Sequence, residues 1–144
     1  MKKKILIIAV AATTMLYGGL TRNQEAVTDT TTGLMWQDNS DVLSKKLSWE
    51  DAITYCENLS LAWYDDWRLP NINELNSVVD DTKQRPALSA IFVQNSGTTW
   101  SSTTHQSFRR EAKMIIFGGY GTVGYINKSL RRGVRCVRTV DAAQ

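Results

Sequence analysis

The chain has 144 residues, of which 42% are hydrophobic and 22% charged, with 17 Lys and Arg against 14 Asp and Glu. Lys2, Lys3 and Lys4 supply the whole excess of bases, because 17 minus these three leaves 14 bases against 14 acids. The composition therefore excludes nucleic-acid binding through overall positive charge, and we expect no nucleic-acid partner. The length fits one domain rather than two.

The N-terminus has the pattern of an export signal. The three lysines precede an apolar run from Ile5 to about Leu16, shorter than the roughly 20 residues that a membrane span needs. We predict a signal peptide over residues 1–19, whose cleavage site the sequence does not define. The mature protein is then expected in the periplasm, at the cell surface or secreted. An uncleaved leader is the alternative, and it would be the only membrane contact.

The first regular elements are expected over residues 27–37 and 48–59. Thr and large apolar residues around Gly33 predict a turn followed by a short strand, and a polar loop over residues 38–46 follows. Ser48 fits the N-cap of a helix. The apolar side chains of that helix recur at steps of three and four: Trp49, Ala52, Ile53, Cys56 and Leu59.

A second helix begins after the segment Asp66-Trp67-Arg68-Leu69-Pro70. Pro70 disfavours helical geometry at the residue before it, and Asn71 with Glu74 matches a capping box. We expect this helix to reach about Val79. A long loop over residues 82–97 follows, in which the apolar residues 88–93 are expected to form a turn of helix.

The rest of the chain predicts β-structure. Strands are expected over residues 98–103, 112–117, 123–127 and 133–139, with a tight connection at Gly118 to Gly121. The order of elements predicts an α+β fold in which two helices pack on a small antiparallel sheet.

Two cysteines in an exported chain predict one disulfide, between Cys56 and Cys136. It would tie the first helix to the last strand. On the chain-entropy model, closing a loop of this length stabilises the fold by about 4.5 kcal/mol.

Several motifs follow one another in a characteristic order: Gly33-Leu34-Met35-Trp36, Trp49 with Cys56, Asp66 to Pro70 with Glu74-Leu75, Trp100-Ser101-Ser102-Thr103, and Val134 to Arg138. In these motifs the chain resembles the DUF1566 family, also called the Legionella collagen-like protein C-terminal domain family. The resemblance extends from about Thr30 to Arg138, and we expect the domain over residues 27–139. It implies a C-type-lectin-like fold related to the formylglycine-generating enzymes, on secreted or surface proteins of bacteria.

The resemblance implies structural roles for the matched motif residues, namely Trp67, Arg68, Leu69, Pro70 and Trp100, besides the cysteines. The adhesin that gives the family its name binds sulfated glycosaminoglycans and is a trimer. This chain has no Gly-x-y collagen region, so a trimerising stalk is not expected, and the oligomeric state stays open.

Basic residues concentrate near the C-terminus, where residues 98–144 hold eight bases and two acids. Two interpretations remain open. Either these bases pair with the acidic N-terminal half, which we favour, or some of them bind an anionic glycan. The candidates for such a binding patch lie in expected loops: Arg109, Arg110, Lys128, Arg131 and Arg132. Four aromatic residues in or beside loops could contact a sugar or a protein: Trp63, Tyr64, Tyr120 and Tyr125.

Catalytic and metal sites are not expected. The segment Trp100-Ser101-Ser102 carries hydroxyls where calcium-dependent lectins have amide and carboxylate ligands. Asp65, Asp66, Asp80 and Asp81 are the remaining candidates for a structural cation, but fit solvated helix ends better. His105 has no evident acid or nucleophile partner. We therefore predict a non-catalytic recognition module without metal or cofactor. The alternatives are an accessory subunit that binds another envelope protein, and an enzyme of the formylglycine-generating branch.

Overall fold

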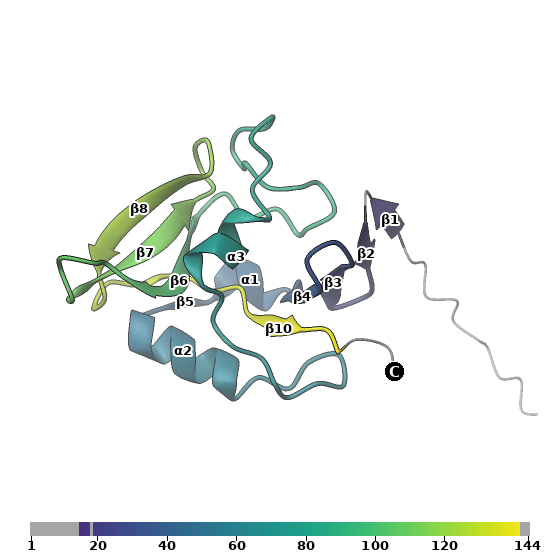
Figure 1. Ribbon diagram of the computed structural model, residues 1–144, viewed down its shortest axis with the longest axis horizontal. Coiled ribbons are helices and arrows are strands. Elements are labelled where there is room, and N and C mark those ends of the chain that lie inside the picture. Colours follow the sequence, from purple (N-terminus) through teal and green to yellow (C-terminus); the bar gives the residue numbers. More distant parts are fainter. Residues whose placement is uncertain (1–14, 18, 142–144) are drawn as a thin grey trace, which may run out of the picture.

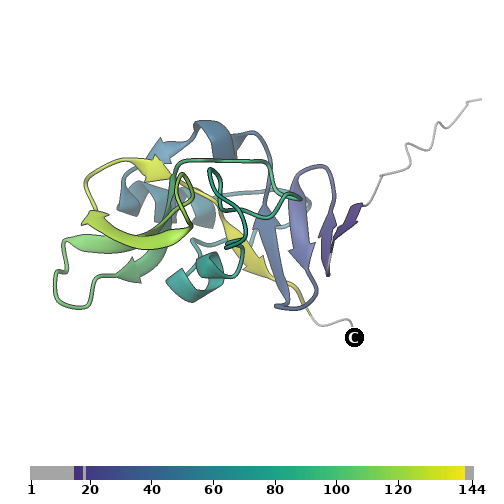
Figure 2. The same cartoon turned by 90° about the horizontal axis from the view of Figure 1, so that it is seen from above.

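Two five-stranded sheets lie towards opposite ends of the molecule, and the helices lie between and beside them (Figure 1, Figure 2). The computed structural model describes residues 15–17 and 19–141. Within those residues the chain forms ten strands and three helices. The α+β class expected from the sequence is confirmed. The single small antiparallel sheet is not, because there are two sheets.

The first sheet joins the two ends of the chain. Its order is β1 (Met15–Tyr17), β2 (Leu20–Arg22), β3 (Ala26–Asp29), β4 (Leu34–Gln37) and β10 (Val137–Thr139). All neighbouring strands are antiparallel, and the register places Val27 and Val137 on either side of Trp36. These three side chains are buried in one hydrophobic cluster. Strand β1 falls inside the predicted leader, of which residues 1–14 and 18 lie outside the described part.

The second sheet is mixed. Its order is β5 (Lys46–Leu47), β9 (Arg132–Gly133), β6 (Thr98–Thr104), β7 (Glu111–Ile116) and β8 (Thr122–Asn127). The pair β6–β9 is parallel, and the other pairs are antiparallel. The β7–β8 connection needs glycine at Gly121, where φ is +70° and an added Cβ would lie 2.4 Å from Cγ1 of Val79.

The two longer helices begin where their capping residues predict. In α2 (Trp49–Glu57), the Ser48 side chain accepts a hydrogen bond from the Asp51 backbone N–H. In α3 (Ile72–Asn76), Asn71 and Glu74 form a complete capping box. These caps satisfy N–H groups that the first helical turn leaves without partners.

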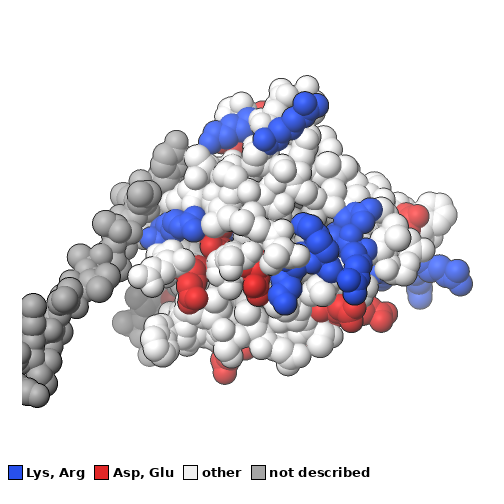
Figure 3. All heavy atoms as spheres, turned by 180° about the vertical axis from the view of Figure 1, so that it is seen from behind, with Lys and Arg blue, Asp and Glu red and all other residues white. Residues whose placement is uncertain are grey.

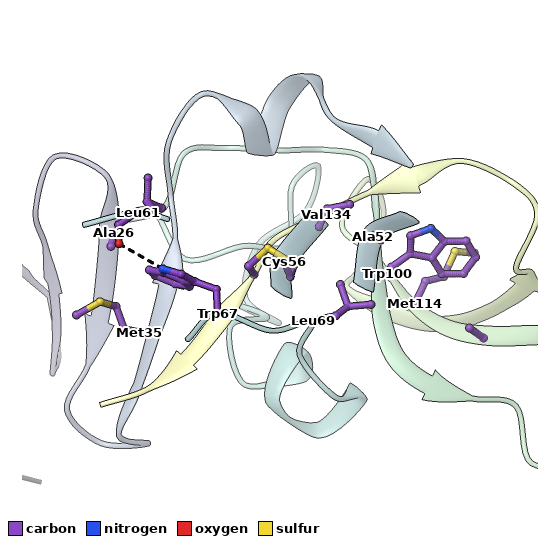
Figure 4. Packing of buried hydrophobic residues seen from close by; sticks show 12 residues of the cluster. Ala26, Met35, Ala52, Cys56, Leu61, Trp67, Leu69, Trp100, Met114 and Val134 are labelled. Carbon is purple, nitrogen blue, oxygen red and sulfur yellow. Dashed lines mark hydrogen bonds between the residues drawn. A yellow bond between two sulfur atoms is a disulfide. The ribbon is translucent and has the colours of Figure 1, made fainter. Parts of the chain in front are cut away.

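The disulfide Cys56–Cys136 lies in the main hydrophobic core, beside Val134 and the side chains of α2 (Figure 4). Its Cα atoms are 5.5 Å apart across 80 positions of sequence. Both cysteines are fully buried, together with Trp100 and Ala52. The disulfide predicted from the sequence is therefore confirmed.

Three expectations about helices were wrong. The predicted loop 38–46 contains a single helical turn, α1 (Asp41–Ser44). Helix α3 ends at Asn76, because the Ser77 hydroxyl bonds to the Glu74 carbonyl and Val79 then pairs with Leu88. Residues 88–93 pack into the core without forming a helix. Side chains from elsewhere in the chain hydrogen-bond to the backbone of this segment instead. The Arg22 guanidinium donates to the Ile91 carbonyl, and the Asp38 carboxylate accepts from the Val93 N–H.

The last predicted strand, over residues 133–139, divides into β9 and β10, which belong to different sheets. Between them, the Cys136 N–H donates to the Gln37 side chain at 3.1 Å, and Arg135 donates to the Gln37 carbonyl at 3.0 Å. The regular strand is interrupted here because Gln37 at the end of β4 bonds to Cys136 with both its backbone and its side chain: its N–H donates to the Cys136 carbonyl at 2.9 Å, and its side-chain oxygen accepts from the Cys136 N–H. Cys136 consequently precedes the last strand instead of lying in it.

None of the helices described in residues 19–141 combines the length and apolar character needed to cross a membrane.

Candidate functional site

The basic residues predicted as a binding patch are spread along the second sheet: Arg109, Arg110 and Lys128 lie where β6 ends and β7 begins, whereas Arg132 lies beside the start of β6. Arg109 and Arg110 are exposed in the β6–β7 connection. The Lys128 N–H donates to the Arg110 carbonyl at 2.8 Å, which joins this connection to the residue after β8. The fold therefore brings Arg110 and Lys128 together, although 18 positions separate them in the sequence.

Lys128 is held in position by three contacts with two residues, Trp49 and Thr104. Its ammonium nitrogen lies 3.8 Å from the centroid of the Trp49 ring and donates to the Thr104 hydroxyl at 2.9 Å. Its carbonyl accepts from the Trp49 N–H at 2.9 Å. The Trp49 indole N–H in turn donates to the Ser101 carbonyl. A cation over a tryptophan face gains electrostatic stabilisation, so this ammonium group is already ordered before any ligand arrives.

Arg131 and Arg132 continue from Lys128 towards β5. The register pairs Arg132 with Leu47, and Gly133 with Lys46. This pairing places the backbone of β5, which carries Lys46 and follows Lys45, next to β9 and Arg132, a neighbourhood that sequence reasoning missed. The sequence gives only a weak indication of this pairing, because β5 and β9 are only two residues long each. We call these seven side chains the basic surface: Lys45, Lys46, Arg109, Arg110, Lys128, Arg131 and Arg132.

None of the basic-surface residues takes part in an ion pair within the described chain. On the face opposite that of Figure 1, Lys and Arg side chains gather in groups, with Asp and Glu side chains beside them (Figure 3). The acid Glu50 lines a hollow of about 170 Å³ together with Lys128. The basic surface is thus available to an external anion but is bounded by acidic groups.

Other bases of the C-terminal half pair with acids of the N-terminal half, as the sequence interpretation favoured. Arg135 pairs with Asp38, and Arg138 binds Asp66 through two hydrogen bonds of 2.6 and 3.0 Å. The hydrogen bonds from Arg138 lower the pKa of Asp66 and reciprocally raise the pKa of Arg138. Long-range pairing therefore accounts for Arg135 and Arg138, but not for the basic surface.

The motif from Trp67 to Pro70 acts as a structural corner. Trp67 is buried, and its indole N–H lies 3.2 Å from the carbonyls of both Leu61 and Tyr64. The backbone of Arg68 pairs with Val137 in both directions, while its guanidinium makes two hydrogen bonds to Glu74. Leu69 and Pro70 are buried.

The same corner is fastened to the second sheet. The Pro70 carbonyl accepts from the Ser102 N–H at 2.8 Å. In β6 the buried Trp100 donates its indole N–H to the Leu47 carbonyl at 2.9 Å. The residues of this motif therefore contact other parts of the protein, as expected for a structural role.

Glu74 is the acid that serves both this corner and the helix cap. Partial burial alone would raise the pKa of Glu74. Hydrogen bonds from the Arg68 guanidinium and the Asn71 backbone N–H outweigh burial, and the pKa is lowered. The negative charge of Glu74 therefore contributes to the folded state.

The cysteine and histidine side chains considered for catalysis make structural contacts. The two thiols form the buried disulfide. The Nδ1 atom of His105 accepts from the N–H groups of Ser107 and Phe108, and its ring contacts Tyr125 edge-on at 4.4 Å. Among the residues that the structure describes, no group of three or more His, Cys, Asp or Glu side chains could hold a metal ion.

The four loop aromatics predicted as contacts lie in different places. Tyr120 belongs to the β7–β8 connection and Tyr125 to β8, whereas Trp63 and Tyr64 lie near the first sheet. Trp63 is fully exposed, and Tyr64 is partly covered by the Arg138 guanidinium, 3.7 Å from its ring centroid. The chain therefore presents two separate candidate surfaces, one basic and one aromatic.

A model of the Lcl C-terminal domain family matches residues 25–138. No match was found among curated proteins.

Proposed function

Because this chain belongs to the Lcl C-terminal domain family, we propose that it is an exported, non-catalytic module that recognises an anionic glycan through the basic surface. Binding would take place at the bacterial cell envelope or outside the cell. We also propose that the fold is C-type-lectin-like.

The observation that carries this proposal is the contrast between two sets of basic side chains. Arg68, Arg135 and Arg138 each have a carboxylate partner, whereas the basic surface has none within the described chain. Like charges that lie close together repel one another, and a polyanion such as a sulfated glycan removes that repulsion. Guanidinium groups also form paired hydrogen bonds with sulfate and carboxylate oxygens.

The order of Lys128 supports the same function. Its contacts with Trp49 and Thr104 restrict the ammonium group, so that less conformational freedom is lost when an anion binds. The burial and pairing of both cysteines support a structural rather than a catalytic use of the thiols.

Chromatography on immobilised heparin tests the proposal. The oxidised protein should be retained and should elute as salt rises, because salt screens interactions between exposed charges. A desulfated heparin matrix of the same chain length serves as the control and should retain the protein less. Absence of retention, or retention that does not depend on salt, would contradict an anionic-glycan function.

A further inference from the structure

The turn at residues 61–64 presents a tryptophan to solvent. Trp63 has a relative exposure of 104%, whereas Trp36, Trp67 and Trp100 are buried. Trp49, the remaining tryptophan, is partly buried against Lys128. A large apolar ring that is fully exposed gives up the stabilisation that burial would provide. The position of Trp63 is therefore not explained by packing of the fold.

The backbone fixes the direction of this side chain. Leu61 and Tyr64 exchange two hydrogen bonds of 3.0 Å, which close the turn. Between them, Ala62 and Trp63 have φ angles of +52° and +69°. Beneath the turn, the Trp67 indole N–H reaches both closing carbonyls, and its bond to Leu61 is drawn in Figure 4. The turn is thus anchored to the core.

A hollow of about 600 Å³ lies beside Trp63, and its volume is within the range of ligand pockets. Glu25 and Asp65 contribute carboxylates to its lining, and Gln24 and Ser60 contribute neutral polar groups. Trp63, Gln24 and Glu25 also line a second hollow of about 280 Å³. Within residues 19–141, neither Glu25 nor Asp65 takes part in an ion pair. The hollow therefore combines an open aromatic face with uncompensated negative charge.

The protein itself binds a cation with the same combination of groups one residue further along the chain. The Arg138 guanidinium lies 3.7 Å from the Tyr64 ring centroid and makes two hydrogen bonds to Asp66. Tyr64 and Asp66 are an aromatic residue and an acid two positions apart. Trp63 and Asp65 have the same spacing, but they face the hollow rather than a guanidinium of this chain.

We propose that Trp63, Asp65 and Glu25 bind an arginine side chain of a partner protein. The guanidinium stacks on the Trp63 ring, as guanidinium groups do on aromatic faces. The carboxylates of Asp65 and Glu25 accept its hydrogen bonds and neutralise its charge. An anionic glycan would be repelled here, so this surface and the basic surface take ligands of opposite charge.

The test uses the oxidised, ¹⁵N-labelled full chain and a blocked five-residue peptide, acetyl-Gly-Arg-Gly-Arg-Gly-amide. Binding is followed by the indole N–H resonance of Trp63 and by the backbone amides of residues 62–65. The same peptide with lysine at both positions is the matched probe for charge alone. The Trp63→Phe variant assigns the indole signal.

Trp63→Gly removes the ring and suits the positive φ of this position, so the turn is retained. It should weaken binding of the arginine peptide by about 3- to 30-fold, the range expected for loss of a cation–π contact. Asp65→Asn and Glu25→Gln should also weaken binding. Ala62→Gly places glycine in the same turn but keeps the ring, and should bind as the unmodified protein does. Tyr120→Ala, which removes another exposed aromatic ring, should have no effect.

Three results would overturn the proposal. Equal binding of the arginine and lysine peptides that survives Trp63→Gly would indicate nonspecific charge attraction. A Trp63 resonance that responds to a neutral oligosaccharide but not to the arginine peptide would assign the hollow to a sugar. A resonance that moves with protein concentration alone would assign it to a second copy of this chain. Heparin retention is independent of all three results, so this proposal and the proposed glycan function can fail separately.

Discussion

Asp38 and Arg135 form an ion pair with almost no access to solvent, since their side chains are 0% and 2% exposed. Burial raises the pKa of Asp38 and lowers that of Arg135, while the attraction between the two charges opposes both changes. Arg22 adds a second basic group at Asp38. Arg135 also donates to the carbonyls of Gln37 and Val93, each at 3.0 Å. This pair thus links β4, the 88–93 segment and the stretch before β10.

We expect each partner of this pair to depend strongly on the other. Asp38→Asn alone should lower the free energy of unfolding by about 3–5 kcal/mol, because it leaves the buried Arg135 charge uncompensated. Arg135→Met alone should cost less, because Arg22 remains paired with Asp38. The double variant should lose less than the sum of the two single losses. Urea unfolding of the four proteins measures this coupling. Lys83→Met, at the more exposed pair with Asp80, is the control, and additive losses would contradict the expectation.

The disulfide should contribute much of the stability of the fold. Replacing both Cys56 and Cys136 by alanine should lower the free energy of unfolding by about 2–5 kcal/mol, mainly because the unfolded chain gains freedom. The comparison is made by urea unfolding without reductant. In the unmodified oxidised protein, denaturation without reductant should expose no thiol to an alkylating agent. Alkylation at both positions in that experiment would refute the assignment.

Acid should destabilise the protein through Asp66 and Glu74, whose pKa values are lowered in the folded state. A lowered pKa means that the carboxylate is favoured in the folded state, so its contribution is complete above the ordinary value of about 4. The contribution is then lost as pH falls through the lowered folded-state pKa. Urea unfolding at a series of pH values below about 5 should show this loss. Asp66→Asn with Glu74→Gln should be less stable at neutral pH and less sensitive to acid; an unchanged acid sensitivity would refute this account.

Heparin binding should depend on where positive charge is removed. Exposed ion pairs contribute about 0.2–1 kcal/mol each, so Arg109→Gln with Arg110→Gln should weaken binding by about 2- to 30-fold. The control is Lys83→Gln with Arg85→Gln, which removes the same charge elsewhere. The Arg85 N–H bonds to Gly119 in the β7–β8 connection, at the far end of the hairpin from Arg110. Equal losses in elution salt for the two double variants would rule out the basic surface.

Local features of the fold could be predicted because their physical causes lie close together in the sequence. Ser48 and Asn71 cap helices through contacts with residues three positions away. The strands β6, β7 and β8 contain β-branched or aromatic residues, which favour strands, and glycine or polar residues lie between them. Helix α3 was predicted too long because the end of a helix depends on competing contacts, here the bridge between Val79 and Leu88.

The candidate sites could be predicted only in part. The five proposed basic residues were identified from their positions in expected loops. Lys45 and Lys46 were missed because only the pairing of β5 with β9 brings their part of the backbone next to Arg132. Trp63 was recognised as a loop aromatic. Its full exposure beside Glu25 depends on the approach of two segments that are distant in sequence.

The sequence by itself determined the family, the α+β class, the starts of α2 and α3 and the partnership of Cys56 with Cys136, since these follow from motifs, periodicity and the presence of two cysteines. Only the tertiary structure decided which charges are internal. Arg135 and Arg132 are alike as residues and lie three positions apart, yet Arg135 is buried against Asp38 and Arg132 has no ion-pair partner in the described chain. The reason is that charge pairing depends on which distant segments meet, and the meeting of β4 with β10 leaves no local trace in the sequence.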